Sequence, residues 1–256
     1  MTFRYALELA YRGTNYHGWQ IQPNVSSVQE KIEKQLTKLM GNVPVSVVGC
    51  GRTDTGVHAS YYVLHFDTEK EQVTDQLVYK LNKMLPEDIA VFSAQPVSEE
   101  FHARFSATAR TYHYFIHQKK NAFALDSHHL VQELDFERMN LAADRLLGTQ
   151  DFTSFSKLHT DVKTNICTVS AAKWHQVSAD SWYFEITADR FLRNMVRAVV
   201  GTLLEVGYGN LDENDVIRIV AAKDRGEAKL SVPARGLFLM DIRYPATLFS
   251  RQSATN

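Results

Sequence analysis

The order in which strand and helix patterns follow one another constrains this fold most, because the same order occurs twice along the chain. Apolar alternation and short apolar runs predict strands at residues 2–11, 43–48, 61–66 and 89–94, and again at 109–117, 171–177, 182–187 and 237–243. Helices are predicted from Ser27 with Glu30 as its capping partner, from Thr74, from Asp135, over 191–206 and over 215–222. The repeated β-α-β-β-α-β order is that of the split β-α-β, or ferredoxin-like, arrangement.

The predicted fold class is therefore α+β, with two ferredoxin-like domains whose mostly antiparallel sheets lie side by side around a central cleft. The join falls near residues 95–105. We predict an N-terminal domain over 1–103, a C-terminal domain over 104–249 and a polar, frayed tail over 250–256. A chain of 256 residues is long enough for each domain to bury a core. Sheets of this kind leave one face without helices.

Several protein classes are excluded by what the sequence lacks. No apolar run approaches the ~20 residues of a membrane helix, and the N-terminus does not read as a signal peptide, so a cytoplasmic protein is expected. Cys50 and Cys167 are isolated, and the histidines show no metal-ligand spacing, so we expect no metal and no cofactor. Net charge is −3 over residues 1–100 and +2 over 101–256, so any phosphate-binding surface must be a local patch.

The most informative segment is a Gly-rich turn at residues 49–59, which reads GCGRTDTGVHA. Its glycines let the backbone approach a ligand closely. It carries one carboxylate, Asp54, two residues after one guanidinium, Arg52. A carboxylate held by nearby donors stays ionised and can act as a nucleophile or base. The alternative is an ordinary turn with a surface Arg-x-Asp pair.

Basic and aromatic residues interleave in the segment 101–114, which reads FHARFSATARTYHY. This composition holds backbone phosphates and unstacked bases together. Arg110 is a candidate phosphate contact, and Tyr112 and Tyr114 fall on one face of the predicted strand. The competing interpretation is that both tyrosines are ordinary sheet aromatics.

Two further segments are candidates for binding. Arg190, Arg193 and Arg197 follow one another at spacings of three and four, which on the predicted helix 191–206 and its entry would place them on one stripe. An anionic partner would relieve their repulsion, and a solvated helix face with Asp189 and Glu205 as counter-charges is the alternative. Leu237 lies in VPARGLFL, where a small apolar wall would pack against a base or an edge strand would enter the core.

Together these segments resemble the bacterial tRNA pseudouridine synthase A family. The matching stretches span nearly the whole chain and read YRGTNYHGWQIQP, SVQEKIE, GCGRTDTGVHA, FHARFSATARTYHY, DFTSFSK, FLRNMVR and PARGLFL. The resemblance implies that Asp54 is the catalytic residue with Arg52 two before it. It implies that Tyr112 stacks on the target base, that Arg197 pairs with the catalytic Asp, and that Leu237 lines the pocket.

The resemblance also implies a substrate and an assembly: uridines 38–40 in the anticodon arm of tRNA, and a homodimer. Arg12 stands where the family often has Asp, and this departure touches none of the catalytic positions. We interpret Arg110, Arg190 and Arg193 as contacts to the RNA backbone.

Uridine isomerisation suits these residues because it needs no redox step and no group carrier. Asp54 can attack the sugar, add to the base, or abstract a sugar proton to give a glycal, and the sequence leaves all three routes open. Two rival functions remain at this point. One is a non-catalytic RNA-binding module of the same fold, and the other is an Asp-dependent hydrolase of a small nucleotide.

Overall fold

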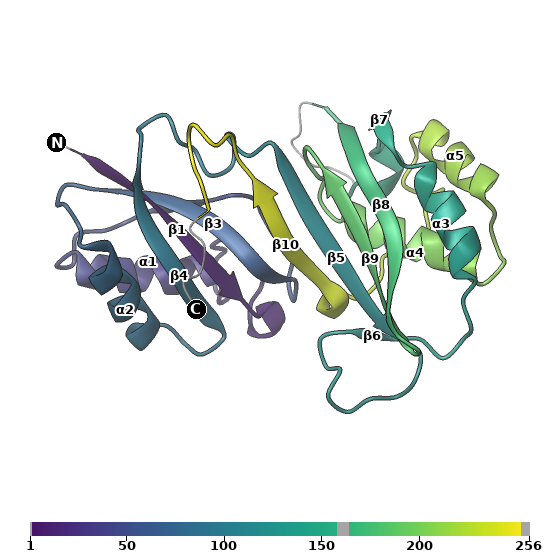
Figure 1. The fold of residues 1–256 in the computed structure, drawn as a ribbon, viewed down its shortest axis with the longest axis horizontal. Coiled ribbons are helices and arrows are strands. Elements are labelled where there is room, and N and C mark those ends of the chain that lie inside the picture. Colours follow the sequence, from purple (N-terminus) through teal and green to yellow (C-terminus); the bar gives the residue numbers. More distant parts are fainter. Residues whose placement is uncertain (1, 158–163, 252–256) are drawn as a thin grey trace. The chain divides into compact units, whose positions relative to one another are not determined.

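The computed structural model describes residues 2–157 and 164–251, and the chain forms two compact units (Figure 1). Unit 1 comprises Met1–Thr108 with Leu239–Asn256, and unit 2 comprises Ala109–Phe238. The predicted domain boundaries placed residues 239–249 in the second domain, whereas the compact units group them with the first. Residues 252–256 of the predicted frayed tail lie outside the described residues, while Ser250 and Arg251 make contacts in unit 1.

Unit 1 is built on a split β-α-β frame. Its elements are β1 (Phe3–Tyr11), α1 (Val28–Leu39), β2 (Val47–Gly49), β3 (His58–Thr68), α2 (Thr74–Met84), β4 (Ile89–Val97) and, from residue 239 on, β10 (Leu237–Arg243). The strand order is β4-β1-β3-β10, and β2 pairs with the far end of β3. The pairs β1–β3, β1–β4 and β2–β3 are all antiparallel. The order β4-β1-β3-β2 is that of a ferredoxin-like sheet, as the sequence predicted.

Most of the helix and strand boundaries predicted from the sequence of unit 1 agree with the structure. The Ser27 hydroxyl caps α1 by accepting from the backbone N–H of Glu30 at 3.3 Å, and Ile32 and Leu36 of that helix are fully buried. The predicted strand 43–48 is wrong at its start. Val43 is exposed and Pro44 cannot donate to a ladder, so pairing begins only at Val47.

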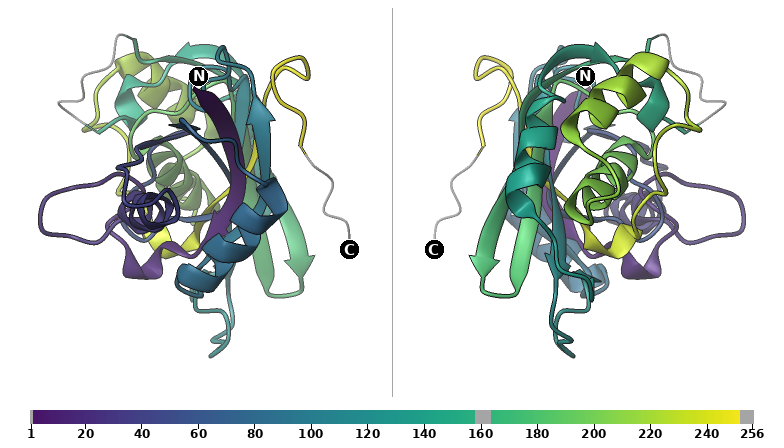
Figure 2. Two further views of the ribbon diagram at one scale, coloured as in Figure 1. Left: turned by 90° about the vertical axis from the view of Figure 1, so that its left-hand side faces the viewer. Right: turned by 90° about the vertical axis from the view of Figure 1, so that its right-hand side faces the viewer.

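The face of the unit 1 sheet opposite α1 is covered by chain without a helix. Figure 2 shows α1 and the segment 244–251 on opposite sides of these strands. On that face Phe101 stacks on Phe249 at 5.3 Å and packs against Tyr244 at 5.2 Å between ring centroids. Below them the buried Glu8 carboxylate accepts hydrogen bonds from Tyr61 and Ser93, each at 2.6 Å. This face of unit 1 is therefore part of its core.

Unit 2 also combines an antiparallel sheet with helices. It contains β5 (Ala109–His117), β6 (His128–His129), α3 (Phe136–Asp144), β7 (Gly148–Asp151), β8 (Ile166–Ser178), β9 (Ser181–Ala188), α4 (Met195–Gly207) and α5 (Glu213–Ala222). Its strands lie in the order β5-β9-β8-β7, with antiparallel pairs throughout that row and a short parallel pairing of β6 with β5. Helices α3, α4 and α5 lie on one side of β8 and β9 (Figure 2). Cross-strand pairs such as Trp174 with Phe184 form the core beneath them.

The predicted helix over 191–206 begins later than expected. Asn194 has a left-handed backbone with φ of 68°, and α4 begins at Met195. The Asn194 amide donates to Ser231 Oγ at 2.6 Å, a contact that holds the residue in this conformation. Arg190 and Arg193 therefore precede the helix, and the predicted stripe of three arginines on one helical face is wrong. Only Arg197 belongs to α4.

Within residues 2–157 and 164–251, no helix combines the length and the apolar character that crossing a membrane requires.

Candidate active site

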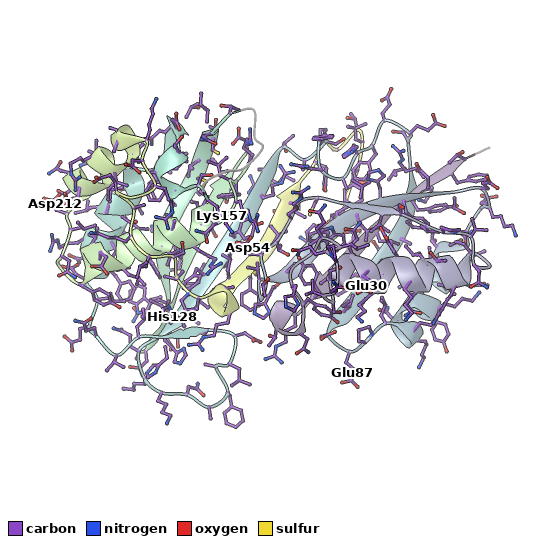
Figure 3. The ribbon with its side chains drawn as sticks, turned by 180° about the vertical axis from the view of Figure 1, so that it is seen from behind. Glu30, Asp54, Glu87, His128, Lys157 and Asp212 are labelled. Carbon is purple, nitrogen blue, oxygen red and sulfur yellow. The ribbon has the colours of Figure 1, made fainter. Side chains whose placement is uncertain are left out.

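The turn that joins β2 to β3 presents the predicted carboxylate. Asp54 is half-buried and Arg52 is exposed. The backbone N–H of Val57 donates to the Asp54 carbonyl at 3.1 Å, which closes the turn, and Gly56 has a φ of 78°. Figure 3 labels Asp54, whose side chain projects from this turn of unit 1. The local fold thus places a carboxylate on a tight backbone bend.

A second loop, residues 12–19 after β1, packs against this turn and fixes its backbone; we call this contact the clamp. The N–H of Trp19 donates to the Thr53 carbonyl and the N–H of Gly56 donates to the Tyr16 carbonyl, both at 3.3 Å. The contact needs glycine: a Cβ on Gly18 would lie 2.3 Å from the Thr53 oxygen, and one on Gly13 would lie 2.0 Å from the Val57 oxygen. The Gly-rich character of both loops is explained by this close backbone approach.

Side chains complete the clamp. The hydroxyls of Tyr11 and Thr53 share a hydrogen bond of 2.8 Å, and the Tyr62 hydroxyl donates to the Gly51 carbonyl at 2.5 Å. Trp19 stacks on Tyr62 with 4.1 Å between ring centroids, and Tyr11 packs edge-on against Tyr62 at 5.5 Å. These rings are buried, so the backbone on both sides of Asp54 rests on a rigid aromatic base.

In unit 2 the two predicted tyrosines have different environments. Tyr114 is fully buried, and its hydroxyl donates to the Pro233 carbonyl at 2.9 Å and lies 3.1 Å from His128 Nδ1. Tyr112 is half-buried and meets Phe191 edge-on, with 5.1 Å between ring centroids. Tyr114 is therefore a core residue, as the interpretation of an ordinary sheet aromatic predicted, whereas Tyr112 is only half-buried.

Unit 2 carries four candidate arginines. Arg110 lies on β5, and the other three lie within residues 190–197. Arg110 Nη1 donates to the Asp189 carbonyl at 2.8 Å. The Asp189 carboxylate accepts from the backbone N–H of Arg190 at 2.7 Å and from that of Thr168 at 2.8 Å, so Asp189 orders the backbone here and is not a counter-charge on a helix face. The Arg193 carbonyl accepts from the N–H of Lys157 at 3.0 Å, a residue labelled in Figure 3.

Arg197 anchors the segment that leads into Leu237. Its Nε donates to the Val232 carbonyl at 2.7 Å, and the Val232 N–H donates back to the Arg197 carbonyl at 3.2 Å. Gly201 allows this approach, since a Cβ there would lie 2.0 Å from the Leu230 oxygen. Leu237 follows and is 5% exposed. The guanidinium of Arg197 is half-buried and has its position set by α4 and by this segment.

One neutral histidine, His128, contacts the Tyr114 hydroxyl. Burial, then Arg235, His117 and His129, lowers the pKa of His128 to about 4, and burial raises the pKa of Tyr114 above its usual value. Both groups are therefore uncharged near neutral pH, which suits a hydrogen bond that supports backbone. Across the described part of the chain, no three His, Cys, Asp or Glu side chains gather closely enough to hold a metal ion.

The predicted site residues thus fall into two groups, one on each unit. Asp54 and Arg52 lie on the turn of unit 1, and unit 2 carries Arg110, Tyr112, Arg190, Arg193, Arg197 and Leu237. The sequence did not reveal the clamp formed by residues 11–19, although two glycines in this nine-residue aromatic segment are a signal of close packing. It also missed Phe191, the ring against which Tyr112 packs.

A carboxylate on a tight turn of unit 1, with arginines and a half-buried tyrosine on unit 2, matches the side chains that an enzyme acting on nucleotides or nucleic acid would use. The tRNA pseudouridine synthase family matches residues 9–106 and 142–245. The chain belongs to this family. Asp54, Arg52, Arg197 and Leu237 lie inside the matched ranges, and Tyr112 lies outside them.

Individual relatives match nearly the full chain. The tRNA pseudouridine synthase A of Bacteroides thetaiotaomicron is 51% identical over 253 residues, which covers 98% of this chain and 94% of the relative. That of Parabacteroides distasonis is 54% identical over 252 residues, covering 96% and 98%. That of Ruminiclostridium cellulolyticum is 40% identical over 241 residues, covering 93% and 98%.

Proposed function

We propose that this protein is a tRNA pseudouridine synthase, which isomerises uridine to pseudouridine in tRNA. The observation that carries the proposal is Asp54 on its clamped turn, inside the part of the chain that matches the family. The reaction breaks the bond between C1′ of the ribose and N1 of uracil, turns the base, and joins C5 to C1′. The proton on C5 is lost to solvent and N1 takes up a proton in its place, so the product has the same atomic composition as the substrate.

We assign Asp54 the role of catalytic carboxylate. An ionised carboxylate can attack C1′, add to the base, or remove a ribose proton, and all three routes use the same oxygen atoms. A clamped backbone favours each of them, because the carboxylate reaches its productive position without losing further conformational entropy. Arg52, two residues away and exposed, supplies a cation for the RNA backbone or for orientation of Asp54.

The target base must leave the helical stack to be reached. Tyr112, half-buried against Phe191, offers a ring face for stacking, and Leu237 offers an apolar wall. Arg110, Arg190 and Arg193 are assigned to backbone phosphates. The role of Arg197 as the cation that pairs with the catalytic carboxylate is carried over from the family resemblance and is part of this proposal.

The finer assignments are also part of the proposal. The substrate region is the anticodon arm, with uridines 38–40 as the modified nucleotides, and the working form is a homodimer in the cytoplasm. These finer assignments rest on the resemblance of the motifs to the tRNA pseudouridine synthase A family, to which the relatives belong.

A direct assay tests the proposed function. Purified protein is incubated with unmodified tRNA transcripts, and pseudouridine is mapped at single-nucleotide resolution by its adduct with carbodiimide. We expect new pseudouridine confined to positions 38–40. A protein that binds these transcripts but forms no pseudouridine would be the non-catalytic RNA-binding module instead. Hydrolysis of a small nucleotide without modification of RNA would support the hydrolase.

A further inference from the structure

Phe105 of unit 1 is a large aromatic side chain held open to solvent. It is 76% exposed, although Phe101 and Ala103, four and two residues before it, are fully buried. Exposed phenylalanines are common singly and need no explanation by themselves. What distinguishes Phe105 is the structure of the turn that presents it.

The turn over residues 102–106 is fixed by its own hydrogen bonds. The N–H of Ser106 donates to the His102 carbonyl at 2.9 Å, and the N–H of His102 donates to Ser106 Oγ at 3.0 Å. His102 Nδ1 accepts from the N–H groups of both Arg104 and Phe105 at 3.2 Å. The backbone under Phe105 is therefore ordered before any partner arrives.

The turn is also anchored to the sheet beneath it. The N–H of Ala103 donates to the buried His65 Nδ1 at 3.1 Å, and the Tyr244 hydroxyl donates to the Ala103 carbonyl at 2.7 Å. One bond comes from β3 and the other from the segment after β10. The rigidity of the turn is thus inherited from the core of unit 1.

Two neighbouring side chains, those of His102 and Arg104, contact the Phe105 ring and hold it in place. The His102 ring stacks on it with 4.4 Å between centroids and 30° between planes, and the Arg104 guanidinium lies 5.5 Å from its centroid. A base has two π faces and a nearby phosphate, and aromatic rings beside arginine are the usual means of holding an unstacked nucleotide. Pre-ordering lowers the entropic cost of such binding.

From this geometry we propose that Phe105 and Arg104 form a second RNA contact, in which Phe105 stacks on an unpaired base of the substrate and Arg104 binds an adjacent phosphate. The proposal rests on the proposed function, because it takes tRNA as the partner. The bound base is unpaired because bases inside a stem have both faces covered by their neighbours. It is a nucleotide other than the uridine that reacts at Asp54.

Binding titrations with unmodified tRNA transcript at several salt concentrations test the contact. We expect Phe105→Leu to weaken binding by about five- to a hundredfold, the range for loss of one base–aromatic stack, without changing the salt dependence. Arg104→Gln should lower the slope of log K against log salt by about one or less. Phe105→Trp should restore binding. Phe123→Leu, at a 95% exposed ring of unit 2, and Arg145→Gln, at an exposed arginine, are matched controls that should bind like wild type.

The base that stacks on Phe105 is identified by combining substitutions in the RNA with the Phe105→Leu substitution in the protein. Unpaired nucleotides of the transcript are replaced one at a time by abasic residues, and each RNA is titrated with wild type and with Phe105→Leu. We expect one position at which the abasic change weakens wild-type binding but leaves binding by the variant almost unchanged. Binding by Phe105→Leu within twofold of wild type, or the absence of any coupled position, would overturn the proposal.

The two proposals fail separately. Wild-type protein that depends on Phe105 for tRNA binding yet forms no pseudouridine contradicts the proposed function and supports the second contact. If the wild-type protein forms pseudouridine and the Phe105→Leu variant binds tRNA normally, the proposed function is supported and the second contact is contradicted. Melting curves of the variants check that the substitutions in this turn have not unfolded the chain.

Discussion

Tyr112 and Tyr114 stand two residues apart on one face of β5, and they have different environments. The Tyr114 hydroxyl is buried against Pro233 and His128, whereas Tyr112 is half-open beside Phe191. Strand periodicity predicted their common face but not this difference, because the partners of each ring come from residues 128, 191 and 233. Residue chemistry singled out Asp54 and Arg52 correctly as neighbours on a tight turn.

The two tyrosines should therefore respond differently to substitution. Tyr114→Phe leaves the Pro233 carbonyl without its donor in the core, and we expect a loss of about 1–3 kcal/mol in the free energy of unfolding. Tyr112→Phe should change stability by less than about 0.5 kcal/mol. Tyr112→Leu should lower the rate of pseudouridine formation because the target base loses its stacking ring. Urea denaturation with single-turnover assays measures both; equal stability losses at the two positions would contradict this division.

Neutralising the arginines should give two phenotypes. For Arg190→Gln and Arg193→Gln we expect weaker tRNA binding and a salt slope reduced by about one or less each, with little change in rate at saturating tRNA. Arg197→Gln should cut the single-turnover rate sharply, because the carboxylate loses its cation. Because Arg197 also donates to Val232, Arg197→Lys is the control that keeps the charge. A shared phenotype for all three would contradict this division: a shared loss of binding would indicate a uniform phosphate track, and a shared lack of effect would indicate a solvated surface.

At the scale of elements, the sequence predicted most strands and helices but not their contacts. The strand at 109–117 and the capped helix from Asp135 are confirmed. The start of α4 was missed because the amphipathic pattern continues through Phe191 and Leu192, while Asn194 breaks the helix through a contact with Ser231. Nothing local in the sequence reports that partner. The clamp of loop 12–19 on the Asp54 turn was hidden for the same reason.

Gly18 and Gly41 form a matched pair for testing the clamp. Both have positive φ, +87° and +75°, but a Cβ at Gly18 meets the Thr53 carbonyl at 2.3 Å and one at Gly41 meets nothing within 4 Å. Gly41→Ala should cost about 1 kcal/mol in unfolding free energy from backbone strain alone. Gly18→Ala should cost more and should also lower the single-turnover rate at least tenfold, since it displaces the backbone beside Asp54. Equal effects on rate would argue against the clamp.

For the whole molecule, composition and element order predicted the α+β class, and the return of the chain's end to unit 1 was not foreseen. Residues 239–251 complete unit 1 through β10, Tyr244 and Phe249. Element order assigned the last strand to the second domain, because that strand completes the second β-α-β-β-α-β order. His65 lies under the same covering segment, and its Nδ1 accepts from Ala103.

This burial makes stability depend on pH. Burial, then Arg4 and His102, lowers the pKa of His65 from 6.5 to about 4. Above pH 6.5 the ring is neutral in both the folded and the unfolded chain, so the full stability is present. Between pH 6.5 and 4 the unfolded chain takes up a proton that the folded chain excludes, and stability falls as pH falls, by up to about 3 kcal/mol for this group.

Unfolding free energies measured from pH 7.5 to 4 test the assignment. His65→Asn keeps an acceptor for the Ala103 N–H and does not titrate. The unfolding free energy of this variant should therefore fall less steeply as pH falls, with a slope that corresponds to about one proton fewer taken up on unfolding. His128, whose pKa is also lowered to about 4, contributes to the remaining slope in the same direction. Burial also lowers the pKa values of His102, His113 and His117, which add to that slope. An unchanged slope in His65→Asn would show that His65 is not the titrating group.

The central claim is that Asp54 is the catalytic carboxylate of a tRNA pseudouridine synthase. The most direct measurement is tritium release from C5-labelled uridine in unmodified tRNA under single-turnover conditions, with binding titrated in parallel. We predict that Asp54→Asn and Asp54→Ala bind tRNA like wild type, because the backbone clamp remains, and release no tritium above background. Release by both variants at a rate within tenfold of wild type would contradict the claim and remove Asp54 from the mechanism.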